Sequence, residues 1–185
     1  MKLLIVDLDG TLFDTKDVNY YAYKEAILSY GYSLEYQYYC EFCNGRHYTD
    51  FLPLITTTDE TILSAIHNAK KKAYSQYLNK AVLNRGLLDI IKALRKSGYK
   101  TAVVTNASKE NCREILDTFN IIDIFDLILT QDDIEKAKPD PEGFLKAMQY
   151  FKVKPEETVI FEDSDVGIEA AERSGAFYYR TYRFN

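Results

Sequence analysis

Several features that mark particular classes of protein are missing from this sequence. It has only three cysteines, an odd set without the spacing of a disulfide framework, which suits a reducing compartment. It has no basic tract and a net charge of −5, which argues against a nucleic-acid-binding surface. The opening apolar stretch is too short for a signal peptide, and no segment approaches the length of a membrane span. We therefore expect a cytoplasmic protein without nucleic-acid or membrane partners.

The sequence also does not favour a zinc site. Cys40 and Cys43 form a Cys-x-x-Cys pair with His47 nearby, but no second cysteine pair or close second histidine completes four ligands. His67 is the only other histidine. We interpret the thiols as packing residues on one helical face.

The composition is that of a small globular enzyme. The chain has 185 residues, of which 46% are hydrophobic, enough to bury a core in one or two compact units. The sequence shows no internal repeat and no low-complexity segment.

The most informative segment is the first. An apolar run, Lys2 to Val6, leads directly into Asp7-Leu8-Asp9-Gly10-Thr11. In open α/β sheets, ligands gather at the carboxyl ends of the strands. Asp7 and Asp9 share one face of an extended chain and could converge on a cation, while Gly10 lets the backbone turn sharply. The alternative is an acidic helix cap in which both carboxylates are only solvated.

Three later segments repeat the pattern of an apolar run followed by polar residues. Their polar ends are Thr105-Asn106, Lys138-Pro139 and Glu162-Asp163-Ser164. Carboxylates suit a divalent cation, whereas a hydroxyl, backbone N–H groups and a lysine suit a phosphoryl group. Taken alone, the lysine would read as an exposed residue before a turn, but the other segments favour a functional role.

These four segments resemble a known family. The motifs Asp7-x-Asp9-Gly10-Thr11, Thr105-Asn106, Lys138-Pro139 and Glu162-Asp163-Ser164-x-x-Gly167 look like the four motifs of the haloacid dehalogenase-like phosphohydrolases, in the same order. The resemblance runs from Met1 to about Phe177. Each motif is weak singly, but four in order are specific. The resemblance implies an α/β fold with a Rossmann-like, doubly wound, mostly parallel sheet and a small inserted helical cap.

The resemblance also implies roles for these residues. Asp7 would be the nucleophile that becomes an aspartyl-phosphate, and Asp9 would protonate the leaving oxygen and then activate water. Thr105 and Asn106 with adjoining N–H groups would hold phosphate oxygens, and Lys138 would offset negative charge on the phosphate and on Asp7.

Magnesium is the cofactor that the resemblance implies. It would lie between Asp7, the backbone carbonyl of Asp9, and Asp163. Glu162 stands at a position that the family uses either as a metal ligand or as an outer partner, and both alternatives stay open.

The domain organisation follows from a change in pattern along the chain. Residues 15–80 read as helical and strand-poor, whereas strands and helices alternate afterwards. We predict an α/β catalytic core of residues 1–14 and 81–185, with residues 15–80 inserted as a helical cap.

Capping residues and apolar periodicity predict where the helices begin and end. In the cap we expect helices at 16–30, 34–43, 48–55 (broken at Pro53) and 57–79, the last opened by a capping box of Thr57 and Glu60. In the core we expect helices at 87–97, 109–119, 141–151 and 166–174, and a last strand at 176–182.

Two cap residues are candidates for contacting substrate. Asn19 is a candidate by resemblance, and Arg46 because a guanidinium binds a phosphate or carboxylate through two hydrogen bonds. An exposed arginine beside a turn is the alternative for Arg46. The cluster Lys70 to Lys72 reads as a solvated helix face, and the many tyrosines of the cap as packing residues.

The sequence favours a magnesium-dependent phosphatase of a small phosphorylated metabolite. A sugar phosphomutase is the nearest alternative, but Asn19 and Tyr48 stand where family mutases carry histidine and arginine. A receiver-like signalling domain or a non-catalytic binding protein is less favoured, because both Asp7 and Asp9 are present and a cap interrupts the first connection. Monomer and homodimer both stay open.

Overall fold

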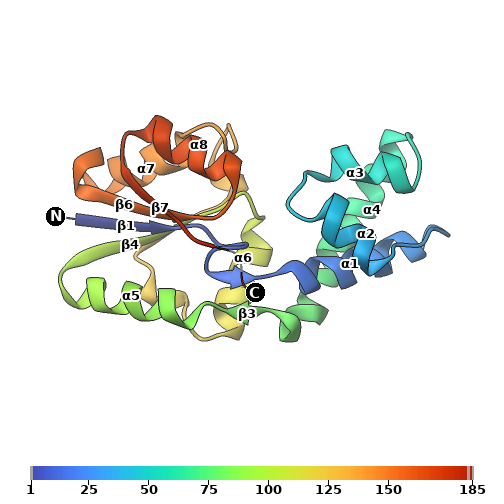
Figure 1. Cartoon of the computed structure of the whole chain (residues 1–185), viewed down its shortest axis with the longest axis horizontal. Coiled ribbons are helices and arrows are strands. Elements are labelled where there is room, and N and C mark those ends of the chain that lie inside the picture. The colour runs from blue at the N-terminus through green and yellow to red at the C-terminus, as the bar shows by residue number, and fades with distance from the viewer. Residues whose placement is uncertain (1, 183, 185) are drawn as a thin grey trace. The chain divides into compact units, whose positions relative to one another are not determined.

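The computed structural model describes residues 2–182 and residue 184, and it divides into two compact units (Figure 1). The α/β unit comprises Met1–Asp14 and Val82–Asn185, and the helical unit comprises Thr15–Ala81. Two ends of the predicted core, Met1 and Asn185, lie outside the described residues. Every helix in the described part of the chain is too short or too polar to cross a bilayer.

The α/β unit is built on a parallel five-stranded sheet. The strand order is β5-β4-β1-β6-β7, with neighbouring strands parallel throughout. The strands are β1 (Lys2–Val6), β4 (Tyr99–Val104), β5 (Leu127–Leu129), β6 (Thr158–Glu162) and β7 (Phe177–Arg180). The chain runs outward in both directions from the central strand β1, which is the reversal that creates a ligand crevice in doubly wound sheets. The predicted fold class is confirmed.

Helices cover both faces of this sheet, with α7 and α8 on one side and α5 on the other (Figure 1). The helices are α5 (Arg85–Lys96), α6 (Lys109–Thr118), α7 (Glu142–Phe151) and α8 (Asp165–Ser174), and the short 3-10 turns are Ile122–Ile124, Gln131–Asp133 and Pro155–Glu157. The core packs strand residues such as Leu3 and Ile5 against Phe144 of α7 and Ala171 of α8. This packing of strands against helices fixes where the carboxyl ends of the strands lie.

Hydrogen-bonding caps start three of these helices. The side chain of Asn84 accepts from the Leu87 N–H at 3.1 Å, and Ser108 accepts from the Asn111 N–H at 3.3 Å. Ser164 accepts from the Gly167 N–H at 3.1 Å. Such caps satisfy N–H groups that the first helical turn leaves unpaired, which is why these starts lie close to the predicted ones.

A second, two-stranded sheet was not predicted. Strand β2 (Phe13–Asp14) pairs antiparallel with β3 (Val82–Leu83), with Phe13 opposite Leu83 and Asp14 opposite Val82. Two residues are too few to show an alternating pattern, so the sequence gives no signal for this ladder. It lies where the chain leaves and re-enters the α/β unit.

The helical unit packs around an aromatic core. Its elements are α1 (Lys16–Leu28), α2 (Tyr36–Tyr38), the π-helical turn η1 (Tyr39–Cys43), α3 (Tyr48–Ile55), α4 (Glu60–Ala73) and the 3-10 segment η2 (Tyr74–Lys80). Tyr20, Tyr23, Tyr39, Phe51 and Cys43 are buried in its core cluster. Part of the tyrosine content is therefore packing, as expected, while Tyr30, Tyr36 and Tyr38 are exposed.

Three boundaries in this unit differ from the predictions. The expected helix at 34–43 is α-helical over three residues only and then continues as a π-helical turn. Helix α3 is not broken at Pro53, because burial of Phe51 and Leu52 offsets the one backbone hydrogen bond that proline removes. Helix α4 begins after Asp59, whose Oδ1 accepts from the N–H groups of Thr61 and Ile62, so the predicted capping box is wrong.

Candidate active site

The carboxyl ends of β1 and β6 bring three acidic side chains together. Asp7 directly follows β1 and is fixed by its N–H, which donates to the carbonyl of Phe161 at 3.0 Å. Glu162 ends β6, and Asp163 follows it. One carboxylate oxygen from each of Asp7, Glu162 and Asp163 lies within 4.8 Å of the other two, and each residue is at least nine-tenths buried. This is the only such group of potential metal ligands among residues 2–182 and 184.

A single lysine joins this acidic group from a distant loop. The ammonium of Lys138 donates to Asp7 Oδ1 at 2.6 Å, to Glu162 Oε1 at 2.7 Å and to the carbonyl oxygen of Val104 at 2.9 Å. Its three N–H bonds are thereby matched to three acceptors. The Lys138 side chain is 5% exposed, so its charge is buried together with the carboxylates that it contacts.

Glu162 is held from its other side by the start of α8. Its Oε2 accepts from the N–H groups of Asp163 at 2.7 Å and Ser164 at 2.9 Å, and from the Ser164 hydroxyl at 3.1 Å. A Cβ added to Gly167 would lie 1.8 Å from Glu162 Oε1, so only glycine leaves room for this carboxylate. The glycine of the fourth motif therefore has a packing role that the motif alone does not reveal.

Asp163 is supported by the turn that follows β1. The Thr11 hydroxyl donates to Asp163 Oδ1 at 2.9 Å. Gly10 has a φ of +90°, and a Cβ there would lie 2.3 Å from Asp163 Oδ2. The guanidinium of Arg180 donates to the Asp163 carbonyl at 3.3 Å. The support from Thr11 and Arg180 was not predicted, because it depends on contacts across the sheet edge.

Burial and charge act in opposite directions on this group. Burial raises the pKa of Asp7 well above its usual range, the Lys138 ammonium opposes that rise, and the charges of Glu162 and Asp163 add to it. Burial alone would lower the pKa of Lys138, but the charges of Asp7 and Glu162 outweigh it and raise that pKa. Two of the three carboxylates contact one ammonium and the third, Asp163, lies beside them, which leaves an excess of negative charge that suits a divalent cation.

The end of β4 lies beside β1. Val103 of β4 pairs with Val6 of β1, so Thr105 leaves the sheet at the same edge as Asp7. Thr105 is buried, and its hydroxyl oxygen accepts from the Ala107 N–H at 3.0 Å. Asn106 is exposed, and its side-chain oxygen accepts from the backbone N–H of Lys138 at 3.1 Å. The Asn106 side chain thus contacts the lysine loop, a contact that its predicted role in phosphate binding did not include.

Asp9 lies in the turn between β1 and β2. It is half-buried and forms an isolated bridge with Phe13, whose carbonyl accepts from the Gly10 N–H at 2.7 Å. Its side chain is not part of the acidic group formed by Asp7, Glu162 and Asp163. Cys112 of α6 lies near these carboxylates. Burial is the main cause that raises the pKa of its thiol to about 12, and the negative charges of Asp9 and Asp7 add to the rise.

The two candidate substrate-contacting residues, Asn19 and Arg46, both lie in the helical unit. Asn19 of α1 is half-buried and donates to the carbonyl and the hydroxyl oxygen of Thr15, at 3.0 and 3.2 Å. Arg46 is exposed in the turn between η1 and α3. Their roles in substrate contact stay predictions. Cys40 and Cys43 pack with the aromatic core of this unit.

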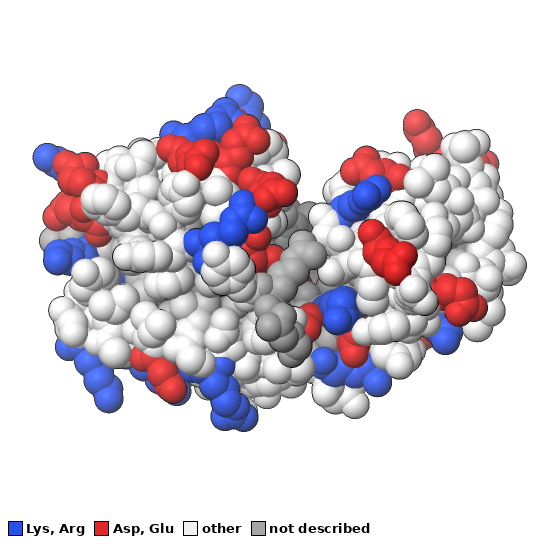
Figure 2. Space-filling model, viewed as in Figure 1, with Lys and Arg blue, Asp and Glu red and all other residues white. Residues whose placement is uncertain are grey.

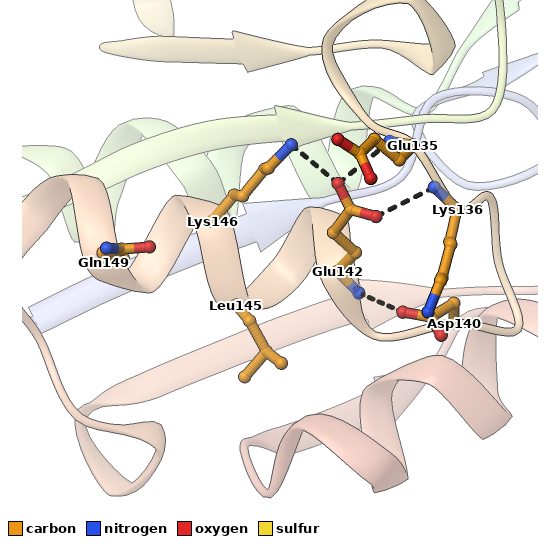
Figure 3. Close-up of a pocket in the computed structure, with 7 residues that line it drawn as sticks. All are labelled: Glu135, Lys136, Asp140, Glu142, Leu145, Lys146 and Gln149. Carbon is orange, nitrogen blue, oxygen red and sulfur yellow. Dashed lines mark hydrogen bonds and ion pairs between the residues drawn. The ribbon is translucent and has the colours of Figure 1, made fainter.

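The surface of the α/β unit shows no concentration of one charge on its visible face. Lys and Arg lie interspersed with Asp and Glu there (Figure 2). An open surface pocket of this unit is lined by residues on either side of Lys138 in sequence, from Glu135 to Gln149 (Figure 3). Lys138 itself does not line this pocket, which is therefore distinct from the acidic group.

The chain is similar in sequence to curated phosphatases and in structure to solved proteins. A phosphorylated carbohydrates phosphatase of Thermotoga maritima is 29% identical over 95% of this chain and 82% of its own length. A phosphoglycolate phosphatase of Aquifex aeolicus is 30% identical with the same coverage. A solved Thermotoga maritima structure, for which beta-phosphoglucomutase activity is proposed, covers this whole chain and 88% of its own, at 26% identity and a TM-score of 0.78.

The family assignment rests on a match over nearly the whole chain. The model of the haloacid dehalogenase-like hydrolases matches residues 4–180, a range that includes all four motifs and both units. The fold described above agrees with it. The chain therefore belongs to the haloacid dehalogenase-like hydrolase family.

Proposed function

We propose that this protein is a magnesium-dependent phosphatase that hydrolyses a small phosphomonoester through an aspartyl-phosphate on Asp7. The observation that carries the proposal is the placement of Asp7. It is buried at the carboxyl end of the central strand, 2.6 Å from the Lys138 ammonium and beside Asp163. Relatives that are phosphatases of phosphorylated carbohydrates and of phosphoglycolate support the same reaction class.

In the first half-reaction the Asp7 carboxylate attacks phosphorus. A bond forms between the carboxylate oxygen and phosphorus while the ester P–O bond breaks, and Asp9 donates its proton to the leaving alcohol. Lys138 keeps a positive charge beside the reacting carboxylate and offsets the charge of the incoming phosphoryl group. Thr105, Asn106 and adjoining N–H groups would bind phosphoryl oxygens.

In the second half-reaction the acid acts as a base. Asp9, now deprotonated, takes a proton from water, the water oxygen bonds to phosphorus, and the bond to Asp7 breaks to release inorganic phosphate. Both aspartates return to their starting states. The two-residue spacing allows one residue to carry the phosphoryl group while its neighbour moves the proton.

The donor set fits magnesium. Asp7 and Asp163 supply the hard carboxylate oxygens that this ion prefers, and the backbone carbonyl of Asp9 would complete the protein ligands. The bound ion would offset charge on the transferring phosphoryl group. Both oxygens of Glu162 already accept hydrogen bonds from the protein, so we place Glu162 as the support of Lys138 rather than as a direct ligand.

The helical unit is proposed to be the cap. Such a unit would exclude bulk water during transfer and contact the leaving group, with Asn19 and Arg46 as the candidate residues. A small phosphorylated metabolite in the cytoplasm is the substrate class and location that we propose.

The test is phosphate release from a panel of small phosphoesters, with and without magnesium, using wild type and Asp7→Asn in parallel. The panel contains sugar phosphates, phosphoglycolate, nucleotides and polyol phosphates. We expect release that requires both magnesium and Asp7. Undiminished magnesium-dependent release by Asp7→Asn would contradict the mechanism.

A sugar phosphomutase is the second candidate, supported by the similarity to the Thermotoga maritima structure for which that activity is proposed. It uses the same aspartyl-phosphate but returns the phosphoryl group to a sugar hydroxyl. Conversion of a hexose phosphate in the presence of a bisphosphate primer, without release of inorganic phosphate, would favour the mutase over the phosphatase.

A further inference from the structure

The loop that carries Lys138 is held by side chains from outside it. It runs from Ile134 to Pro141, between the 3-10 turn Gln131–Asp133 and helix α7, and contains no regular secondary structure of its own. The Lys138 ammonium lies 2.6 Å from Asp7 at the end of a long flexible stem, so how firmly it is held there depends on how firmly the loop backbone is held. What fixes this loop therefore bears on the chemistry of Asp7.

Glu142, the first residue of α7, contacts the loop through its carboxylate (Figure 3). Its Oε1 accepts from the Glu135 N–H at 2.9 Å, and its Oε2 accepts from the Lys136 N–H at 2.8 Å. Lys146, one turn further along α7, donates to Oε1 at 2.6 Å. The carboxylate thus bridges two consecutive backbone amides of the loop to the helix.

These contacts are not those of an ordinary helix cap. An acidic residue at a helix start normally interacts with N–H groups of its own first turn. The two amides bound by Glu142 lie seven and six residues earlier in sequence, outside α7. The hydrogen bonds from Lys146 and from the Glu135 N–H lower the pKa of Glu142 to about 2, so its carboxylate is ionised near neutral pH.

Three further hydrogen bonds hold the loop at Lys138 and on its C-terminal side. Arg173 of α8 donates to the carbonyl of Pro139 at 2.8 Å, and Asn106 accepts from the Lys138 N–H at 3.1 Å. Asp140 accepts from the Glu142 N–H at 3.0 Å. The loop is therefore attached on both sides of Lys138, and Glu142 is the anchor on the N-terminal side.

We propose that Glu142 is a positioning residue, whose carboxylate holds the amides of Glu135 and Lys136 and thereby places the Lys138 ammonium between Asp7 and Glu162. The inference rests on the proposed function of that site. Groups that stabilise developing charge are effective when they are already in position, and a displacement of about 1 Å costs roughly a hundredfold in rate. Glu142 itself does not touch the reacting atoms.

The first experiment compares Glu142→Gln with a matched control, Glu156→Gln. A glutamine would present an NH2 group to a backbone N–H or to Lys146, so it loses at least one of the bonds. Glu156 is an exposed carboxylate of the same unit, paired with Lys154 only at 3.9 Å. We expect faster hydrogen exchange at the amides of Glu135 and Lys136 and a kcat reduced roughly ten- to a hundredfold with a smaller change in KM. The control should change neither.

A second variant separates positioning from an effect on the helix. Glu142→Asp keeps a negative charge in the first turn of α7, where the helix dipole favours it, but is one methylene too short to reach both amides. If Glu142 positions the loop, Glu142→Asp behaves like Glu142→Gln. Wild-type exchange and turnover in Glu142→Asp would overturn the proposal.

A double-mutant cycle with Lys138→Met tests the route of the effect. If Glu142 acts through Lys138, Glu142→Gln causes little further loss of kcat, and a smaller shift in the urea midpoint, once Lys138 is replaced. Full additivity in both measurements would overturn the proposal. Wild-type protein that hydrolyses no phosphoester would refute the proposed function alone, because the exchange rates and the urea cycle still decide whether Glu142 positions Lys138.

Discussion

The two units differ in what they bury. At the carboxyl edge of its sheet the α/β unit buries Asp7, Thr105, Glu162 and Asp163. The helical unit buries mainly apolar and aromatic side chains, with Thr15 and Lys70 as its buried polar residues. Burying a carboxylate is unfavourable unless donors or cations compensate it, and here Lys138 and backbone N–H groups do so. Concentrated polar burial thus marks the candidate site in the α/β unit, and the helical unit has little buried polarity of this kind.

Lys70 shows how the helical unit deals with a buried charge. The expected solvated helix face does not include it, because its side chain lies over the rings of Tyr23 and Tyr74, at 5.2 and 4.8 Å from their centroids. The faces of aromatic rings attract a cation but bind it less strongly than a carboxylate does. The same residue type is therefore held by ion pairs in one unit and by aromatic rings in the other.

The largest effect is expected from a carboxylate of the α/β unit. Asp9→Asn removes the proposed proton donor, so kcat should fall by roughly 10² to 10⁴. Asp17→Asn in the helical unit is the matched control, since Asp17 is bound to Tyr36 by an exposed hydrogen bond. Steady-state rates of phosphate release measure both. Equal losses of kcat in Asp9→Asn and Asp17→Asn would contradict the placement of the chemistry in the α/β unit.

The two buried lysines give a comparison of stability. Lys138→Met leaves Asp7 and Glu162 without their cation, so the free energy of unfolding should fall by about 3 kcal/mol. Lys70→Met keeps the apolar stem but removes the interaction of the ammonium with the tyrosine rings, which should cost about 1 kcal/mol. Urea unfolding at pH 7 without metal measures both. A greater loss in Lys70→Met would reverse the comparison.

Alanine substitution at two glycines with similar φ angles distinguishes the cost of backbone strain from the cost of a steric clash with a neighbouring side chain. Gly10 and Gly31 have φ of +90° and +83°, so alanine is strained at both by about 1 kcal/mol. At Gly31 nothing lies within 4 Å of the added Cβ, whereas at Gly10 it would displace Asp163. We expect Gly10→Ala to lose about 2 kcal/mol and most of its activity, and Gly31→Ala to keep its activity. Thermal melts and phosphate-release assays distinguish them.

The smallest effect concerns pH and the helical unit. Burial, and then the charges of Lys71, Lys70 and His47, lower the pKa of His67 from 6.5 to about 4. The unfolded chain therefore binds a proton between these pH values while the folded chain does not, so stability should decrease as the pH falls from about 6.5 to 4.

His67→Phe isolates this contribution. It keeps a ring stacked on Tyr48, at a centroid distance of 4.0 Å, but removes the titration. Because the imidazole is partly exposed, we expect wild type to lose only about 1 kcal/mol more than the variant over this pH range. Urea midpoints at several pH values measure the difference. Identical pH slopes would show that His67 titrates normally.

The elements that carry the motifs were predictable because their signals are local. Strand β1 is a continuous apolar run, Ser108 and Ser164 are short polar caps, and Gly175 adopts a φ of +77° where α8 was predicted to stop. In each case neighbouring residues decide the conformation. The parallel sheet then brings strand ends to one edge, which is why Asp7, Glu162 and Asp163 could be grouped from the sequence.

The contacts that hold the site together depended on tertiary structure. Although the family resemblance implied that Lys138 acts on Asp7, its bonds to Glu162 and to the carbonyl of Val104 were not expected. Neither was the hydroxyl of Thr11 on Asp163 or the bridge from Glu142 to the loop. Sequence spacing carries no information about such distances. Helix α3 continues through Pro53 for the same reason, since burial in the aromatic core overrides a local preference.

The antiparallel pairing of β2 and β3 brings together the two points at which the helical unit is inserted into the chain. Asp14, the last residue before the helical unit, lies opposite Val82, the first residue after it, in an antiparallel pair. A tight turn can join two residues so arranged. An evolutionary gain, loss or exchange of the whole insertion would therefore leave every strand of the five-stranded sheet in place. If the helical unit contacts substrate as proposed, substrate preference can then diverge while the acidic group at the sheet edge stays the same.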